Sequence, residues 1–156
     1  MKLSEITAEN LIFPTLEATS IPGILRELAR GVCAAGKYPD EELLYQRLMQ
    51  RESQESTGIP NGLAIPHCKV ENLRQLILAI GYAPSNGVDF KAMDGQRTNF
   101  FFLLISPSNE SVPYLRALAS LSRLLKSPTF LAELHKRPAA SELLRFIREE
   151  ESLAVK

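Results

Sequence analysis

Apolar stretches with helical spacing alternate along the chain with continuous apolar runs that are typical of buried strands. Residues 21–36 predict a first helix, and Pro22 lies in a first turn, where proline is tolerated. Residues 40–50 predict a second helix with Asp40 as its candidate N-cap. The first helix carries one apolar stripe at helical spacing, formed by Ile24, Leu25, Leu28, Ala29 and Val32.

Two continuous apolar runs predict strands that are buried on both faces. The first covers residues 75–82 and the second covers residues 99–105. No Lys or Arg lies within the second run, so its three phenylalanines are interpreted as core rather than as a base-stacking surface. Residues 84–95 between the runs contain Asn-Gly and Asp-Gly, which favour turns. Residues 3–13 predict a short strand or edge segment.

The C-terminal third predicts three more helices. The first begins at the candidate N-cap Ser111 and ends near Pro128. Residues 129–137 and 141–151 predict the other two, with His135 as a solvated helix end. Glu149 to Glu151 are expected to form a solvated, frayed end, because negative charges oppose the helix dipole there. The predicted buried side of the first of these helices consists of Leu115, Leu118, Ala119, Ser122 and Leu125.

The alternation of strands and helices favours an α/β fold in which helices cover both faces of a sheet. The region from Leu63 to Ile105 contains consecutive strands and turn signals, so part of the sheet is expected to be antiparallel. We therefore predict a three-layer α/β/α domain with a central mixed β-sheet flanked by helices. Residues 1–156 are expected to form a single domain.

Composition narrows the classes of function. The 18 Lys and Arg balance the 18 Asp and Glu, which argues against a nucleic-acid partner or an anionic-membrane surface. Cys33 and Cys68 show no metal-ligand spacing, so neither a metal nor another cofactor is expected. The first five residues lack an apolar signal core, and the run at residues 100–105 is too short to span a bilayer. We expect a cytoplasmic protein without membrane insertion.

The stretch from Ser56 to His67 reads STGIPNGLAIPH and ends in one of the chain's two histidines. Pro66 biases Ile65 towards extended geometry, so His67 should follow a stiff, strand-like segment. Hydroxyl and peptide N–H groups near Gly58 suit an oxyanion. On residue types alone, a loop histidine bonded to backbone or water is the commoner explanation, since a functional histidine needs a partner group.

The stretch resembles the phosphorylation-site signature of enzyme IIA proteins of the bacterial phosphotransferase system, fructose/mannitol type. Within that type it is most similar to the nitrogen-regulatory IIA proteins. Lys69 and Glu71 extend the match, and the pair Arg51-Glu52 corresponds to an Arg-Glu pair of the family. The family's run reads S-T-G-I-G-x-G-x-A-I-P-H, so Pro60 stands in place of a glycine.

The resemblance implies a phosphohistidine carrier that accepts its phosphoryl group from HPr or a related phosphocarrier. His67 is then the acceptor, and Arg51 lies near the phosphate. Ser56, Thr57 and Gly58 are expected to bind phosphate. Without the resemblance, Arg51 is better interpreted as a cation that satisfies the last carbonyls of its helix.

Tyr114 falls where the family carries a second histidine. It is either an amphipathic residue at a helix start or a hydroxyl that bonds to a phosphoryl oxygen. The substitution motivates one alternative, a regulatory binding module that does not transfer phosphate. We find no fused IIB sequence or permease segment, so the nitrogen-regulatory function is favoured over a sugar-specific component that serves a IIB protein.

A third alternative, a histidine-dependent hydrolase, is weaker. Ser56 and Thr57 lie near His67 in the sequence, but no acidic residue is recognisably placed to orient the imidazole. Either a IIB protein or a regulatory target protein remains a further expected partner of the phosphorylated chain.

Overall fold

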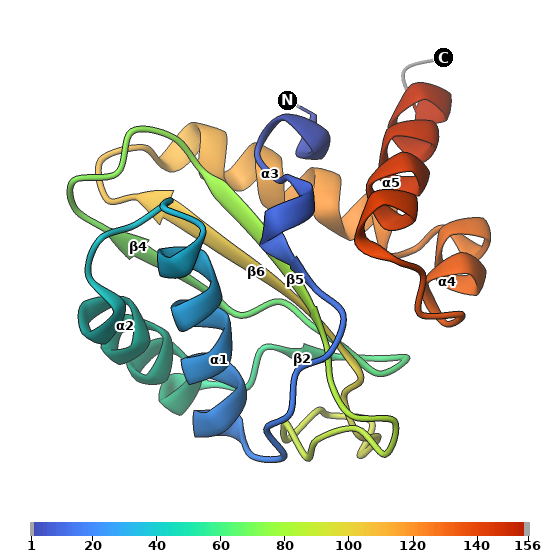
Figure 1. Cartoon of the computed structure of the whole chain (residues 1–156), viewed down its shortest axis with the longest axis horizontal. Helices are drawn as coiled ribbons and strands as arrows, with labels where there is room; N and C mark the ends of the chain where they lie inside the picture. Colours follow the sequence, from blue (N-terminus) through green and yellow to red (C-terminus); the bar gives the residue numbers. More distant parts are fainter. Residues whose placement is uncertain (1, 155–156) are drawn as a thin grey trace.

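The computed structural model describes residues 2–154 (Figure 1). Its centre is a six-stranded sheet. The strands are β1 (Ile12–Phe13), β2 (Gly58–Ile59), β3 (Leu63–Ala64), β4 (His67–Val70), β5 (Ile77–Tyr82) and β6 (Phe100–Pro107). The α-helices are α1 (Ile21–Ala34), α2 (Glu41–Gln54), α3 (Ser111–Leu124), α4 (Pro128–Leu134) and α5 (Ala140–Ala154), and two 3₁₀ turns, Leu3–Glu5 and Glu9–Leu11, precede β1.

Strand β6 organises the sheet. One edge of β6 pairs antiparallel with β5, and the other edge pairs parallel first with β3 and then with β4. Strand β1 pairs parallel with β5, and β2 forms an antiparallel hairpin with β3. The predicted mixed sheet is therefore confirmed. The register places His67 opposite Leu104 and Leu63 opposite Phe100, so successive short strands share one edge of β6.

Helices cover both faces of the sheet, as predicted. Figure 1 shows α1 and α2 on one side and α3, α4 and α5 on the other. Alternate residues of β6 separate the two cores, because successive strand residues point to opposite faces. Phe101, Leu103 and Ile105 join the core under α1 and α2. Phe100, Phe102 and Leu104 join the core under the other three helices.

Several predicted elements have other ends in the structure, most notably the segment 3–13 and the second helix. The segment 3–13 contains two 3₁₀ turns and only a two-residue strand, Ile12–Phe13. Helix α2 continues to Gln54 rather than ending near residue 50, since nothing in Arg-Glu-Ser-Gln interrupts a helix. Arg51 therefore lies within the last turn of α2, with its side chain free to point along the helix side as well as towards the helix end.

The predicted buried side of α3 was mostly wrong. Leu115 is 61% exposed, and Ala119 and Ser122 are also exposed. The buried side instead consists of Ala117, Leu121 and Leu124. Because apolar residues occur on more than one side of α3, helical spacing alone fits two rotations of the helix. The candidate N-cap was also wrong, since α3 begins at Ser111 and Glu110 precedes it as the N-cap residue.

The acidic end of α5 is not merely solvated. The Glu151 carboxylate accepts hydrogen bonds from the backbone N–H groups of Leu3 and Ser4, the latter at 3.2 Å. Ser127 donates its hydroxyl to Glu150 at 3.0 Å. The first N–H groups of a helix lack partners within the helix, so a carboxylate satisfies them well. The expectation of a frayed end was wrong, because it ignored the chain's first 3₁₀ turn.

Candidate active site

His67 begins β4, directly after the stretch that the sequence singled out. Its imidazole Nδ1 lies 2.7 Å from the carbonyl oxygen of Ile65. Its Nε2 lies 3.2 Å from Nε of Arg51, which donates a hydrogen bond to it. Since the Arg51 Nε always carries a hydrogen, Nε2 must accept. The proton of the neutral ring therefore lies on Nδ1, which donates to Ile65, and the lone pair lies on Nε2.

Arg51 satisfies the end of its helix, as one interpretation of its sequence position predicted, and it also contacts His67. Its Nη1 donates to the carbonyl of Glu55 at 2.7 Å, as a cation at a helix C-terminus commonly does. Its Nε faces the imidazole of His67 at the same time. One guanidinium thus satisfies the helix end and contacts Nε2 of His67, which a lysine ammonium cannot do with the same geometry.

The surroundings keep His67 neutral. The ring is half-buried, and burial lowers the pKa of His67 below its ordinary value of 6.5. The hydrogen bond to the Ile65 carbonyl opposes this shift of the pKa, and the positive charge of Arg51 adds to it. A neutral imidazole at pH 7 retains the lone pair that a nucleophile needs.

A cleft of about 380 Å³ opens at His67 between α2, β4 and the start of α3. The ring of Tyr114 lies in it, with its centroid 6.0 Å from that of His67. The Lys69 ammonium lies 5.1 Å from the Tyr114 ring centroid. Sequence reasoning thus placed Tyr114 beside His67 correctly. The cleft is lined by Arg47, Gln50, Arg51, Gln54, His67, Cys68, Lys69 and Tyr114.

The polar groups of Ser56, Thr57 and Gly58 are already bonded elsewhere. Ser56 donates its hydroxyl to the carbonyl of Phe90 and accepts from the N–H of Gly58. Thr57 donates both its N–H and its hydroxyl to the carboxylate of Glu52, each at 2.7 Å. None of the three lines the cleft. Their contacts fix the loop before the β2–β3 hairpin, and their role in binding phosphate stays a prediction.

Sequence reasoning gave no role to several polar residues that line the cleft. Lys69 lies two residues after His67 in β4, so both side chains point to the same face. Arg47 lies one helical turn before Arg51 and donates to the carbonyl of Lys69 at 2.9 Å. It also pairs with Glu71 at 3.0 Å. Sequence spacing could have found these residues. Lys69 lies two residues from His67 in a strand, and Arg47 lies four residues from Arg51 in a helix, so each shares a face with its neighbour.

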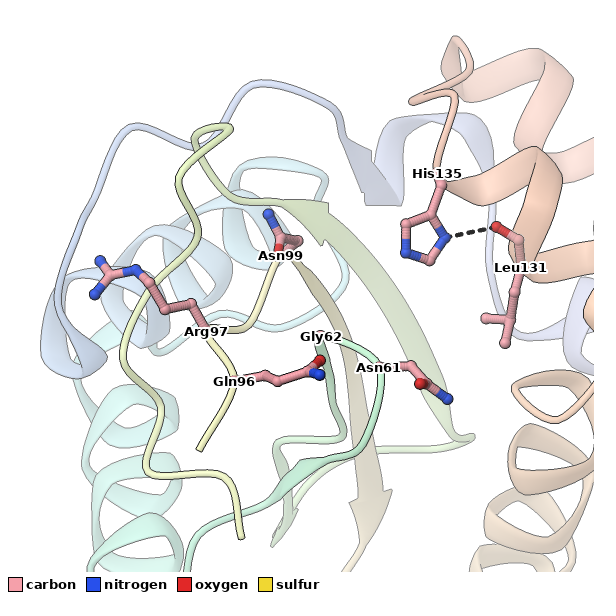
Figure 2. A pocket seen from close by; sticks show the side chains of 7 residues that line it. All are labelled: Asn61, Gly62, Gln96, Arg97, Asn99, Leu131 and His135. Atoms are coloured by element: carbon pink, nitrogen blue, oxygen red, sulfur yellow. Dashed lines mark hydrogen bonds between the residues drawn. The ribbon is translucent and has the colours of Figure 1, made fainter. Parts of the chain in front are cut away.

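A second cleft, of about 460 Å³, holds the chain's other histidine (Figure 2). The Nδ1 of His135 lies 2.7 Å from the carbonyl oxygen of Leu131. The guanidinium of Arg97 donates to the carbonyls of Asn86 and Gly87, and Figure 2 shows it pointing away from the imidazole. The other lining residues, Asn61, Gly62, Gln96 and Asn99, present three side-chain amides. This cleft therefore resembles a hydrogen-bonding surface rather than a phosphate site.

Comparison with known proteins matches residues 5–150 to the family described as "Phosphoenolpyruvate-dependent sugar phosphotransferase system, EIIA 2". A nitrogen regulatory protein of Bradyrhizobium diazoefficiens is 33% identical over 126 residues, which cover 81% of each chain. A fructose-specific EIIABC component of Bacillus subtilis is 28% identical over 149 residues. That match covers 96% of this chain but 23% of the Bacillus protein, so this chain spans about a quarter of it.

Solved structures share the fold. The nitrogen regulatory protein IIA-Ntr of Neisseria meningitidis superposes with a TM-score of 0.85 at 23% identity, covering 93% of this chain and 98% of that one. A complex of enzyme IIA for mannitol with phosphorylated IIB from Escherichia coli gives 0.73 at 20% identity, covering 91% and 96%. At these identities the likeness establishes the fold alone. Among residues 2–154, no helix combines the length and the apolar composition that crossing a bilayer requires.

Proposed function

The chain belongs to the phosphoenolpyruvate-dependent sugar phosphotransferase system EIIA 2 family, and we propose that it is a phosphohistidine carrier of the regulatory, nitrogen type. His67 accepts the phosphoryl group from an HPr-like phosphocarrier. The observation that carries the proposal is the state of the imidazole. The ring is neutral, its tautomer is fixed by Ile65, and its Nε2 lone pair accepts a hydrogen bond from the Arg51 guanidinium in the lining of an open cleft.

The transfer step follows from that tautomer. The Nε2 lone pair of His67 attacks the phosphorus of the carrier's phosphohistidine in line. A new N–P bond forms while the carrier's N–P bond breaks, and that electron pair returns to the carrier's imidazole. The proton on Nδ1 stays hydrogen-bonded to the Ile65 carbonyl throughout. Such transfers depend mainly on positioning and on charge stabilisation.

Arg51 has to change partner during this step. In the unphosphorylated structure its Nε–H occupies the Nε2 lone pair. When the phosphoryl group arrives at Nε2, the planar guanidinium fork can move to the phosphoryl oxygens, for which it is well shaped. Lys69 adds a second positive charge on the same side of the sheet. The Tyr114 hydroxyl lies in the same cleft and is a candidate donor to a phosphoryl oxygen.

The regulatory assignment is supported by the relatives of matching size. The chain covers 81% of the nitrogen regulatory protein of Bradyrhizobium diazoefficiens and 95% of that of Pseudomonas aeruginosa, to which it is 27% identical. A phosphoryl group adds a dianionic charge to the cleft, and such a change can be sensed by a target protein.

A sugar-specific role is the second candidate. The fructose-specific protein of Bacillus subtilis matches almost this entire chain, and the mannitol IIA fold is solved in complex with its phosphorylated IIB. The two functions differ in the acceptor of the phosphoryl group. Rapid transfer from the purified phosphoprotein to a fructose or mannitol IIB would favour the sugar role, whereas slow or absent transfer would favour the regulatory one.

Intact mass measurement tests the proposal. The protein is incubated with phosphoenolpyruvate, enzyme I and HPr. We expect one phosphate adduct on the unmodified chain and on His135→Ala, but none on His67→Ala. His135→Ala is a matched control because that histidine lies in the other cleft. A folded protein that gains no adduct with any HPr-like carrier would instead support a binding module that does not transfer phosphate.

A further inference from the structure

Glu52 is a buried carboxylate that the transfer step does not use. Its side chain lies just inside the last turn of α2, beside Arg51, and the residue is 9% exposed. Within residues 2–154 it is the one charged residue among the buried ones, and it forms no salt bridge with any residue in that range. Its partners are the N–H and the hydroxyl of Thr57. The positive charge of Arg51 partly offsets the burial of this carboxylate but forms no close ion pair with it. A buried carboxylate that depends mainly on hydrogen bonds is costly, so its contacts need an explanation.

The contacts lead to the imidazole. Thr57, held by Glu52, accepts at its carbonyl a hydrogen bond from the N–H of Ile65 at 3.0 Å. The carbonyl of Ile65 in turn accepts the Nδ1–H of His67 at 2.7 Å. Arg51 reaches the other ring nitrogen directly. Two adjacent residues of α2 thus act on opposite sides of one ring, one by direct contact and the other through two backbone carbonyls.

We propose that Glu52 is a positioning residue that fixes the tautomer of His67. By anchoring Thr57 it holds Ile65 where its carbonyl takes the Nδ1 proton, which leaves the lone pair on Nε2. The effect on phosphoryl transfer rests on the proposed function, whereas the effect on the tautomer does not.

The geometry predicts which substitution at this position is tolerated. Thr57 presents two donors to the carboxylate, an N–H that is fixed and a hydroxyl that can rotate. A glutamine can accept the fixed N–H at its amide oxygen and donate its NH₂ to the rotated hydroxyl. Glu52→Gln therefore retains the anchor without the charge, while Glu52→Ala removes both hydrogen bonds.

Nitrogen-15 NMR of the histidine rings tests the proposal, because the two tautomers give distinct Nδ1 and Nε2 shifts. We expect the wild type and Glu52→Gln to carry the neutral proton of His67 on Nδ1. In Glu52→Ala a substantial Nε2–H fraction should appear. His135, which is bonded to Leu131 in the other cleft, is an internal control and should not change. Thr57→Val removes only the hydroxyl donor, so it should give an Nε2–H fraction smaller than that of Glu52→Ala. It replaces Glu52→Ala as the test variant if that protein does not fold.

Phosphorylation rates complete the test. We expect Glu52→Ala to be slower by on the order of tenfold or more, and Glu52→Gln to stay within about threefold of the wild type, since a misplaced reacting group reduces the rate steeply. A wild-type His67 tautomer in folded Glu52→Ala, or in Thr57→Val if that is the variant that folds, would overturn the proposal. A changed tautomer in a chain that no carrier phosphorylates would leave Glu52 as a positioning residue and overturn the proposed function instead.

Discussion

The chain contains two histidines, and each lies in a cleft with its Nδ1 2.7 Å from a backbone carbonyl. What differs is the environment of the other nitrogen. The Nε2 of His67 faces Arg51 in a half-buried position, whereas His135 is exposed at the end of α4 among side-chain amides. Under the proposed function, an anchored imidazole is therefore not enough to make a phosphoryl acceptor. The neighbouring cation and the burial distinguish the two sites.

Replacing each histidine in turn gives the largest expected difference. His67→Ala should lose the phosphate adduct completely, and His135→Ala should gain it at a rate within about twofold of the wild type, because no residue of its cleft takes part in the step. Time-resolved intact mass spectrometry measures both rates. Equal loss in the two variants would show that the comparison between the clefts is wrong.

Arg51→Lys tests whether the planar guanidinium of Arg51, or only its positive charge, distinguishes the cleft of His67 from that of His135. A lysine keeps the charge but cannot contact Nε2 and the Glu55 carbonyl together, so the phosphorylation rate should fall by roughly a hundredfold, as is common when a preorganised donor is lost. Quench-flow kinetics with phosphorylated HPr provide the rate. An unchanged rate would remove Arg51 from the mechanism.

The pH dependence of the rate tests the neutral state of His67. Burial and Arg51 lower the pKa of His67 below 6.5, so the neutral, reactive form is lost only as the ring gains a proton around that lowered pKa. The midpoint of the fall in rate should therefore lie below pH 6.5. Arg51→Ala should move the decline to higher pH, because the repelling charge is gone. A decline centred above pH 6.5 in the wild type would contradict the assignment.

Tyr114 should have a smaller effect. If its hydroxyl donates to a phosphoryl oxygen, Tyr114→Phe should lower the rate or the lifetime of the phosphoprotein by roughly threefold to tenfold, the usual range for one lost hydrogen bond. Tyr114→Phe keeps the ring, which lies near both Lys69 and His67. If both rate and lifetime are unchanged, the tyrosine acts only through its ring.

The smallest expected effect concerns stability. Burial raises the pKa of Glu52 above 4.5, and the Thr57 hydrogen bonds oppose this. Because the pKa of Glu52 is higher in the folded than in the unfolded state, a protonated Glu52 stabilises the fold. This stabilisation is complete below pH 4.5 and is lost as the pH rises through the pKa of the folded state. The free energy of unfolding of the wild type should therefore fall relative to that of Glu52→Gln between pH 4 and pH 7. Urea denaturation of both proteins at pH 4 and at pH 7 measures the difference between their free energies of unfolding. The same difference at both pH values would refute the prediction.

The sequence brought His67, Arg51 and Tyr114 together as the structure does, but it also placed Ser56, Thr57 and Gly58 at a cleft that they do not line. His67 could be singled out because Pro66, the glycines and the short strand act locally. The position of Arg51 followed from the family resemblance, since the contact between α2 and β4 is not visible in local spacing. The rotation of α3 was missed because Leu115 and Leu121 are equally apolar, and only packing decides between them.

Hydrogen bonds of two acidic side chains are further features that could not be predicted. The pairing of Glu151 with the backbone of Leu3 joins residues 148 positions apart, and no local pattern encodes it. The pairing of Glu52 with Thr57 spans only five residues, but it needs the turn after α2 to point Thr57 back at the helix. The sequence alone showed Glu52, Thr57 and Glu151 as charged or polar residues, without their partners.

The site of the phosphoryl group on the protein tests the central claim most directly. Histidine labelled with ¹⁵N is incorporated, the protein is phosphorylated, and the coupling between ³¹P and each ring nitrogen is recorded. The structure predicts one phosphorus, bonded to Nε2 of His67, while Nδ1 retains its proton and His135 is unmodified. A phosphorus bonded to Nδ1 of His67, or to any other residue, would contradict the account.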